Sequence, residues 1–322
     1  MSPDNYPLVS VITPSFNQAQ FLEETILSVL DQNYPNTQYI VIDGGSTDGS
    51  VDIIKTYEDR LAYWVSEPDR GQSHAINKGW QRATGDILAY LNADDVYTPG
   101  AITAAVHALL ANSEACMVYG DALFTNEHGK IRKKYKALPF DIHRTLESND
   151  GFIPQATAFI RRHALDSVGL LDEELHMVMD YDLWVRLGLQ YPVTSLPGIY
   201  LAKVREHSSA KSTATVDKFP LERRRVLNKV FSRDDLPASI RGLQSRAYGQ
   251  VAFMQAILAG RAGQPDRILH PLFHAMVGCP VTVARTPLTY YLIARSLVPW
   301  WEGKPSPAVW HALDRVMESV RA

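Results

Sequence analysis

Two adjacent acids, Asp94 and Asp95, follow an apolar run over residues 87–91 that is typical of a buried strand. Like charges this close repel, and one carboxyl tends to keep its proton unless a cation or hydrogen-bond donors offset the repulsion. A solvated turn before the next helix would also explain the pair, because Asp is common in turns. Magnesium typically takes one or two carboxylates together with substrate phosphates. Taken alone, the two interpretations are balanced.

A third acid, Asp43, ends another strand-like run over residues 38–43. Gly44 and Gly45 follow it and allow the backbone to turn sharply and to approach a ligand closely. A carboxylate at the end of a strand can accept a hydrogen bond from a base N–H or a ribose hydroxyl. We therefore interpret Asp43 as a nucleoside-binding residue. Because it lies on the same edge as Asp94 and Asp95, a divalent-ion site becomes the better interpretation of those two acids.

Three later residues are further candidates. Asp180 begins a helix expected over residues 181–189, where it is either a first-turn acid that stabilises the helix or a general base whose pKa its apolar neighbours raise. Arg205 and His207 follow a strand expected over residues 199–204. Two residues apart in extended backbone, they point to the same side and could face a diphosphate together. A lone His is more often structural.

The elements that must position these residues alternate along the first hundred positions. Strand-like runs cover residues 8–13, 38–43, 62–66 and 86–92, and helix-period segments cover 21–32, 48–58 and 72–83. This alternation predicts a largely parallel sheet covered by helices on both faces, with ligands beyond the carboxyl ends of the strands. The segments that follow those ends supply the candidate residues Thr13, Pro14, Phe16, Asn17, Asp43, Gln72, Asn92, Ala93, Asp94 and Asp95.

The composition is that of an ordinary globular protein. The 322 residues are 46% hydrophobic with a formal charge of −3 and no long run of one sign, so nothing indicates a nucleic-acid partner. The two cysteines match no disulfide framework or zinc spacing, which favours a reducing compartment. We expect no signal peptide, no transmembrane helix and a cytoplasmic location. From residue 218 the pattern is helical, which predicts a main domain over 1–216 and a helical region over 217–322.

Two common nucleotide sites lack support. The segment after the first strand, TPSFNQ, contains neither G-x-G-x-x-G nor G-x-x-x-x-G-K-[ST]. A haloacid dehalogenase-type phosphatase needs two acids one residue apart at its first strand, and Asp43-Gly44-Gly45 lacks the second.

Taken together, the motifs resemble the inverting family 2 glycosyltransferases, enzymes of the GT-A fold that transfer a sugar from a nucleotide donor. The resemblance covers residues 8 to about 212. Its segments are VSVITPSFNQAQFLEETILSVLDQNYPNTQYIVIDGGSTDGS, SEPDRGQSHAINKGWQRATGDILAYLNADD, FIPQATAFIRRHALDSVGLLDEEL, MDYDLWVRL and VREHSSAKS. Five segments in the family's order form a specific pattern. The resemblance implies a GT-A sheet, mostly parallel and flanked by helices, with a C-terminal helical extension.

The resemblance also implies roles. Thr13, Pro14 and Phe16 would contact base and ribose, Asp43 would read the base, and Gln72 and Asn77 would line the nucleotide pocket. Asp94 would lie near ribose or donor sugar, and Asp95 would bind Mg²⁺ or Mn²⁺ on the diphosphate of a UDP-sugar. Asp180 matches the general base, and Arg205 with His207 matches the segment that touches diphosphate or metal. His74 and Met179 depart from the family's common residues, which affects donor preference and the tuning of Asp180.

The expected activity is the metal-dependent transfer of a sugar, with inversion, to a hydroxyl acceptor such as a lipid-linked glycan. The enzyme would be of the hexosyltransferase type and would act in surface polysaccharide or glycolipid assembly. Residues 272–301 could contact the cytoplasmic face of the inner membrane peripherally, or they could pack on the catalytic domain or a second subunit. An inactive sugar-nucleotide-binding scaffold and a nucleotidyltransferase are the alternatives. The acids at 43, 95 and 180 argue against the first, and TPSFNQ lacks the glycine- and basic-rich loop of the second.

Overall fold

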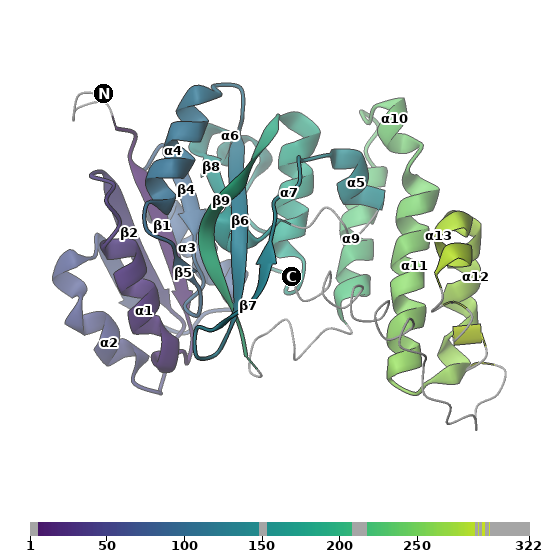
Figure 1. Ribbon diagram of the computed structural model, residues 1–322, viewed down its shortest axis with the longest axis horizontal. Coiled ribbons are helices and arrows are strands. Elements are labelled where there is room, and N and C mark those ends of the chain that lie inside the picture. Colours follow the sequence, from purple (N-terminus) through teal and green to yellow (C-terminus); the bar gives the residue numbers. More distant parts are fainter. Residues whose placement is uncertain are drawn as a thin grey trace. The chain divides into compact units, whose positions relative to one another are not determined.

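The computed structural model describes residues 6–147, 153–207 and 218–286, with helical positions 289, 292, 293 and 296. The chain forms two compact units (Figure 1). The sheet unit comprises Met1–Phe140 and Ile153–Ser208, and the helical unit comprises Asp141–Phe152 and Ser209–Ala322. The boundary expected near residue 216 lies outside the described residues. No pattern in the sequence indicated that residues 141–152 belong to the helical unit.

The first half of the sheet unit follows the alternation read from the sequence. Four parallel strands lie in the order β3-β2-β1-β4, namely β3 (Tyr63–Ser66), β2 (Thr37–Asp43), β1 (Val9–Ser15) and β4 (Ile87–Tyr90). Strands β1 and β4 are buried along their whole length, as expected of parallel strands covered on both faces. The expected parallel sheet is confirmed for these strands, and their carboxyl ends share one edge.

The second half makes the nine-stranded sheet mixed. Strand β8 (Phe159–Arg161) runs antiparallel between β4 and β6 (Met117–Asn126), while β9 (Val193–Glu206) runs parallel to β6. Strand β7 (Ile131–Tyr135) pairs with β6, and β5 (Val96–Tyr97) pairs with β9. Because Val96 lies opposite Lys203, the end of β9 runs beside the residues that follow β4. A 3₁₀ turn, η3 (Gln155–Thr157), leads into β8.

Helices cover both faces of the sheet. On one face, α1 (Ala19–Leu30), α2 (Ser50–Thr56) and α4 (Ala101–Ala111) contribute to a core with the inward residues of β1, β2 and β4. On the other, α3 (Gln72–Arg82) packs against β1 and β2, and α6 (Arg162–Val168) packs against β8 and α7 (Met179–Gln190). The burial of apolar side chains thereby fixes the positions of the helices that lie next to the candidate site residues.

The helical unit is built around α11 (Gln244–Arg261), which packs against α9 (Phe219–Phe231) and α12 (Leu269–Gly278) (Figure 1). Its other helices are α5 (Ile142–Glu147), α10 (Ala238–Arg241) and α13 (Pro280–Arg285). Gly249 and Gly278 allow α11 and α12 to approach closely, since a Cβ at Gly278 would lie 2.4 Å from the Ser245 carbonyl oxygen. None of the helices in the described ranges is both long and apolar enough to cross a membrane.

The packing of α3 on β1 yields a prediction at Gly79. A Cβ there would lie 2.5 Å from Cγ2 of Ile12, so we expect Gly79→Ala to destabilise the sheet unit by about 1–3 kcal/mol despite the better helix propensity of Ala. Ile12→Ala alone should cost about 2–5 kcal/mol. The double variant should cost less than the sum by about 1 kcal/mol or more, because the small side chain makes room. Urea unfolding measures this cycle, and strictly additive losses would contradict the proposed clash.

Candidate active site

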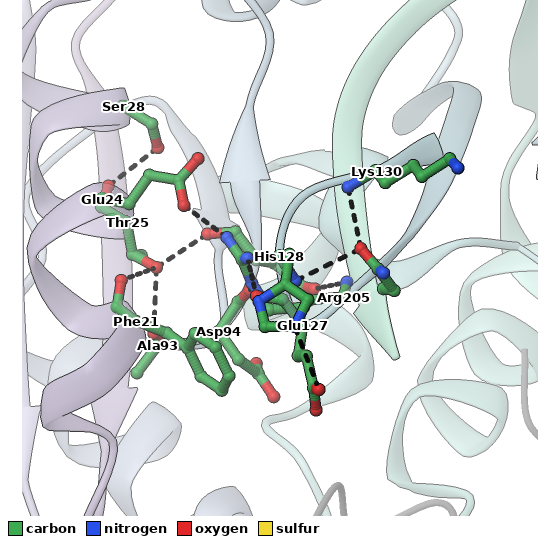
Figure 2. A network of polar contacts seen from close by, with 12 residues as sticks. Phe21, Glu24, Thr25, Ser28, Ala93, Asp94, Glu127, His128, Lys130 and Arg205 are labelled. Carbon is green, nitrogen blue, oxygen red and sulfur yellow. Dashed lines mark hydrogen bonds and ion pairs between the residues drawn. The ribbon is translucent and has the colours of Figure 1, made fainter. Parts of the chain in front are cut away.

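The loop that follows β4 carries the two acids and is held by its neighbours. Its backbone continues the sheet through a bond from the Leu91 N–H to the Ile12 carbonyl, and the Asp95 N–H closes a turn onto the Asn92 carbonyl. From α1, the Thr25 hydroxyl lies 2.9 Å from the Ala93 carbonyl oxygen and 2.8 Å from that of Asp95 (Figure 2). The loop is therefore fixed before any ligand binds.

Arg205, at the end of β9, ties the loop to the rest of the sheet unit. Its backbone N–H donates to Oδ1 of Asp95 at 3.0 Å, and its Nε donates to the Asp94 carbonyl at 3.0 Å. The remaining guanidinium nitrogens bind the Glu127 carbonyl and the Glu24 carboxylate (Figure 2). The side chain is 5% exposed and stacks over Phe21. The sequence predicted a diphosphate contact for Arg205, whereas in this structure its donors bind protein groups.

His207 lies beside Asp94. Its Nε2 is 2.9 Å from Oδ2 of Asp94, and its ring stacks at a tilt on Phe21, with ring centroids 4.9 Å apart. The His207 side chain is 2% exposed and that of Asp94 is 18% exposed. This contact is a hydrogen bond or ion pair between the two side chains. A divalent ion at His207 stays a prediction, and the sequence had paired His207 with Asp95 for that role.

Asp95 is a buried acid with incomplete compensation. It is 4% exposed, and burial together with the nearby charge of Asp94 raises the pKa of its carboxyl well above the usual range. The Arg205 N–H, the Asn92 amide and the Arg205 charge oppose this shift only in part. A carboxyl in such surroundings favours a proton or a nearby cation. Asp94, Asp95 and His207 thus lie together at this edge of the sheet, in what we call the cation-binding corner for the role proposed below, and the binding of a cation there stays a prediction.

Asn92 and Gln72 are brought together as the sequence predicted. The Gln72 amide donates to Oδ1 of Asn92 at 2.6 Å, and the Asn92 amide donates to Gln155 at 3.0 Å. Gln155 in turn donates to the Tyr90 carbonyl. This chain of amides links the start of α3, the acidic loop and η3. These bonds hold the segments that follow β3 and β4 in a fixed orientation.

Asp43 is placed differently from the expectation. Its side chain is fully buried and accepts from the backbone N–H groups of Gly45 and Ser46 and from the hydroxyls of Ser46 and Ser66, at 2.6–3.1 Å. Both carboxylate oxygens are thus engaged in holding the turn after β2. In this structure Asp43 shapes the pocket, and its contact with a base stays a prediction.

Asp69, which the sequence reasoning did not select, lies in the segment that follows β3, beside Gly44. A Cβ at Gly44 would lie 2.6 Å from Oδ2 of Asp69 and 3.3 Å from the Phe16 ring, so Asp69 and Phe16 flank Gly44. Phe16 is 60% exposed and presents its ring for stacking. Only Gly at position 44 leaves room for this approach. The acid in the segment EPDRG at the third strand end was the signal that could have identified it.

Four other predicted contacts serve mainly to position the pocket. Thr13 and Pro14 are buried in β1, and the Thr13 hydroxyl bonds to that of Tyr39. Asn17 adopts a positive φ of 52°, and its side chain accepts from the Thr47 N–H. Asn77 is 3% exposed and exchanges two hydrogen bonds with the backbone of Leu171. The nucleotide contacts that the family resemblance implies for Thr13 and Asn77 stay predictions. Ala93 is buried under the loop.

Asp180 and Asp95 approach one buried hydroxyl, that of Tyr90. Burial raises the pKa of Tyr90 well above its usual value, and the charges of Asp180 and Asp95 raise it further. The Tyr90 hydroxyl has no hydrogen-bond partner within the described chain. By contrast Asp182, two residues beyond Asp180, is 2% exposed and binds Arg186. The structure thus separates an acid at the site from an acid that stabilises α7. Nothing in the sequence had marked Tyr90.

A bound metal ion would need ligands from the substrate in addition to those from the protein. Across residues 6–147, 153–207 and 218–286, no group of three or more His, Cys, Asp or Glu side chains is arranged to hold a metal ion by itself. The carboxylate and imidazole of Asp94 and His207 provide two ligands, and Mg²⁺ commonly takes its remaining ligands from water and phosphates.

Solved structures share this fold. Staphylococcus aureus TarS 1-349 in complex with UDP-GlcNAc superposes with a TM-score of 0.63 at 17% identity over 91% of this chain and 89% of that one. A mannosyltransferase from Pyrobaculum calidifontis, in complex with GDP-Man and Mn²⁺, superposes with a TM-score of 0.62 at 18% identity over 99% of this chain and 87% of that one. The chain therefore has the GT-A fold.

Sequence relatives define the family. The family model described as glycosyl transferase family 2 matches residues 10–169. An uncharacterized glycosyltransferase of Mycobacterium tuberculosis (strain H37Rv) is 31% identical over 185 residues, which are 57% of this chain and 70% of that relative. One from Rickettsia bellii is 31% identical over 64% of this chain, which spans only 31% of its length. The chain belongs to glycosyl transferase family 2, and it is a glycosyltransferase.

The bonds of Arg205 predict how its conservative replacement behaves. Lysine keeps the charge but cannot bind two carbonyls and a carboxylate at once, so we expect Arg205→Lys to lower the free energy of unfolding by about 2–3 kcal/mol. Glu24→Gln removes only a half-exposed partner and should cost about 1 kcal/mol or less. Urea unfolding compares the two. An Arg205→Lys protein of wild-type stability that binds donor poorly would show that Arg205 is instead a ligand.

Proposed function

We propose that the protein transfers a sugar from a nucleotide-diphosphate donor, with a UDP-sugar favoured, to a hydroxyl acceptor, with inversion at the anomeric carbon and with the help of Mg²⁺ or Mn²⁺. The observation that carries the proposal is the cation-binding corner at the carboxyl edge of the sheet. There Asp94 and His207 lie 2.9 Å apart beside the buried carboxyl of Asp95. A site of this kind suits a ligand that brings its own phosphate oxygens.

The residues of this corner fit a divalent ion bound to a diphosphate. Asp94 and His207 would hold the ion, with Asp95 behind them supplying negative charge. When bound, such an ion stabilises the charge that grows on a departing nucleoside diphosphate. Arg205 supports this arrangement from β9, because its bonds fix the backbone of Asp94 and one carboxylate oxygen of Asp95.

Asp180 is the proposed general base. It begins α7 near the Tyr90 hydroxyl, which also lies near Asp95, so an acceptor hydroxyl and a donor diphosphate could meet there. Asp180 would accept the proton of the acceptor hydroxyl as that oxygen attacks the anomeric carbon from the face opposite the leaving group. A single displacement inverts the configuration. The Tyr90 hydroxyl could donate a hydrogen bond to Asp180 or to the substrate.

The nucleoside would lie where Phe16, Gly44 and Asp69 meet. The exposed Phe16 ring offers a stacking surface, and the Asp69 carboxylate can accept a hydrogen bond from a base N–H. Gln72 and Asn92 would contact the ribose or sugar, and Asp43 would hold the turn below them. The two solved neighbours carry different nucleotide sugars, UDP-GlcNAc and GDP-Man, and therefore support a nucleotide-sugar donor without favouring one base.

The proposed acceptor is a glycan, such as a lipid-linked glycan, in cell-surface polysaccharide assembly. A Bacillus subtilis chain whose name assigns it to teichuronic acid biosynthesis is 36% identical over 130 residues, 39% of this chain and 52% of that relative. Such a role would place the enzyme in the cytoplasm or peripherally at the membrane. The region 272–301 proposed for membrane or subunit contact lies partly outside the described residues.

The cation-binding corner predicts a linked response to metal and nucleotide. UDP or a UDP-sugar should raise the melting temperature more with Mn²⁺ than without it, because a ligand that binds only the native state stabilises that state. Asp94→Asn, Asp95→Asn and His207→Ala should each weaken the Mn²⁺ dependence at least about tenfold. Asp52→Asn removes an exposed acid of α2 and serves as the matched control. No thermal shift with any nucleotide sugar, or a metal response unchanged in all three variants, would refute the proposal.

The two acids of α7 predict opposite phenotypes. Asp180→Asn should lower the rate of donor hydrolysis or transfer by about 10²–10⁴-fold while donor binding and stability remain near wild type. Asp182→Asn should lower stability, because it weakens the buried pair with Arg186, but should retain turnover per folded molecule. Kinetics and thermal melting on both proteins provide the comparison. Full activity in Asp180→Asn would remove it from the mechanism.

A further inference from the structure

The helical unit contains a cavity of about 650 Å³ that the catalytic proposal does not use. It lies along α11 and is bounded by residues of α9, α10 and α12. This volume is in the range of small-molecule binding sites. Because every residue that lines it belongs to the helical unit, the cavity is independent of how the two units are arranged.

The charge of the cavity has one sign. Its described lining includes Arg224 from α9, Arg241 from α10, and His270 and His274 from α12, and it includes no Asp or Glu. Two arginines and a pair of histidines from three separate helices therefore face one space, with no acid among the described lining residues. A concave surface of one charge sign concentrates ligands of the opposite sign.

Several donors in this lining have no protein partner. Arg224 makes no ion pair or hydrogen bond with any residue of the described chain, and the same holds for the side chain of Gln255. His270 and His274 bond only to each other, with their Nε2 atoms 3.3 Å apart. Arg241 is partly engaged, since it donates to the carbonyls of Arg233 and Asp234. Arg224, His270 and His274 are exposed, so their donors face water and can exchange it for a ligand that is rich in acceptors.

Part of the lining is apolar. Val251 and Ala252 of α11 are buried, Val277 of α12 is 64% exposed, and the close approach of Gly249 and Gly278 fixes the crossing of the two helices. The site thus combines apolar surface with arginine and histidine side chains. That combination suits an anionic group attached to an organic body.

We propose that this cavity is a binding site for a phosphate group carried by an organic molecule, distinct from the nucleotide site of the sheet unit. Arg224 is its principal contact, because a guanidinium matches phosphate oxygens with paired donors. Gln255, His270 and His274 complete the donor set. The phosphate can belong to a soluble ester or to a lipid headgroup, and the chemistry of recognition is the same.

The test compares two neighbouring arginines in the full-length protein. Arg224 and Arg225 are both exposed residues of α9, but only Arg224 lines the cavity, so Arg224→Gln and Arg225→Gln remove the same charge from different faces. Glycerol phosphate binding is measured by calorimetry. Sedimentation measures binding to phosphatidylglycerol vesicles, with phosphatidylcholine vesicles as the neutral reference. Both variants keep an unaltered sheet unit, so phosphate bound there cancels.

We expect Arg224→Gln to weaken binding at least about tenfold relative to Arg225→Gln in one or both assays. Loss in the glycerol phosphate assay identifies a soluble ester as a ligand, and loss only in the vesicle assay identifies a lipid headgroup. Gln255→Glu, which places an acid in the cavity, should weaken the same binding, and its melting temperature reports whether the unit remains folded.

Equal binding by the Arg224 and Arg225 variants in both assays would overturn the proposal. Phosphate binding that requires added Zn²⁺ and survives Arg224→Gln would also overturn it, since the histidine pair would then be a metal site. Donor hydrolysis should be unchanged in both arginine variants, because neither residue belongs to the nucleotide site.

Discussion

The candidate site depends on one interaction, the attachment of Arg205 to the loop that carries Asp94 and Asp95. The acids follow β4, whereas Arg205 and His207 end β9, more than a hundred residues later. The Arg205 N–H and guanidinium fix this loop, and the same strand end then places His207 against Asp94. Without this junction two adjacent carboxyls, one of them buried, would repel each other without a defined partner. The second half of the sheet therefore serves to complete the site that the first half begins.

Acids of the same type have separate tasks because their surroundings differ. Asp43 and Asp182 are buried, have several partners and stabilise local structure. Asp69 and Asp180 are less buried, and their contacts with a ligand stay predictions. All four carboxylates have the same intrinsic chemistry, so desolvation and nearby hydrogen-bond donors decide what each can do.

Sequence reasoning succeeded where local pattern decides the outcome. The runs that form β1, β2 and β4 are largely buried, so their apolar composition marked them within one or two residues, and their carboxyl ends gathered Gln72, Asn92, Asp94 and Asp95 as expected. Contacts that a distant partner decides had no signal in the sequence. Asn77 binds the backbone of Leu171, Thr13 binds Tyr39, and Arg205 binds Glu24 and Glu127, and none of these pairings has a local signature. The inclusion of residues 141–152 in the helical unit is a tertiary fact of the same kind.

The most direct test of the proposed metal site is a crystal structure of the protein with UDP and Mn²⁺. We expect metal density within bonding distance of Asp94 and His207 on the diphosphate side of the loop. We also expect Arg205 to keep its bonds to Glu24, Glu127 and the Asp94 carbonyl. A metal bound elsewhere, or an Arg205 side chain that leaves those partners to bind the diphosphate, would contradict this proposal.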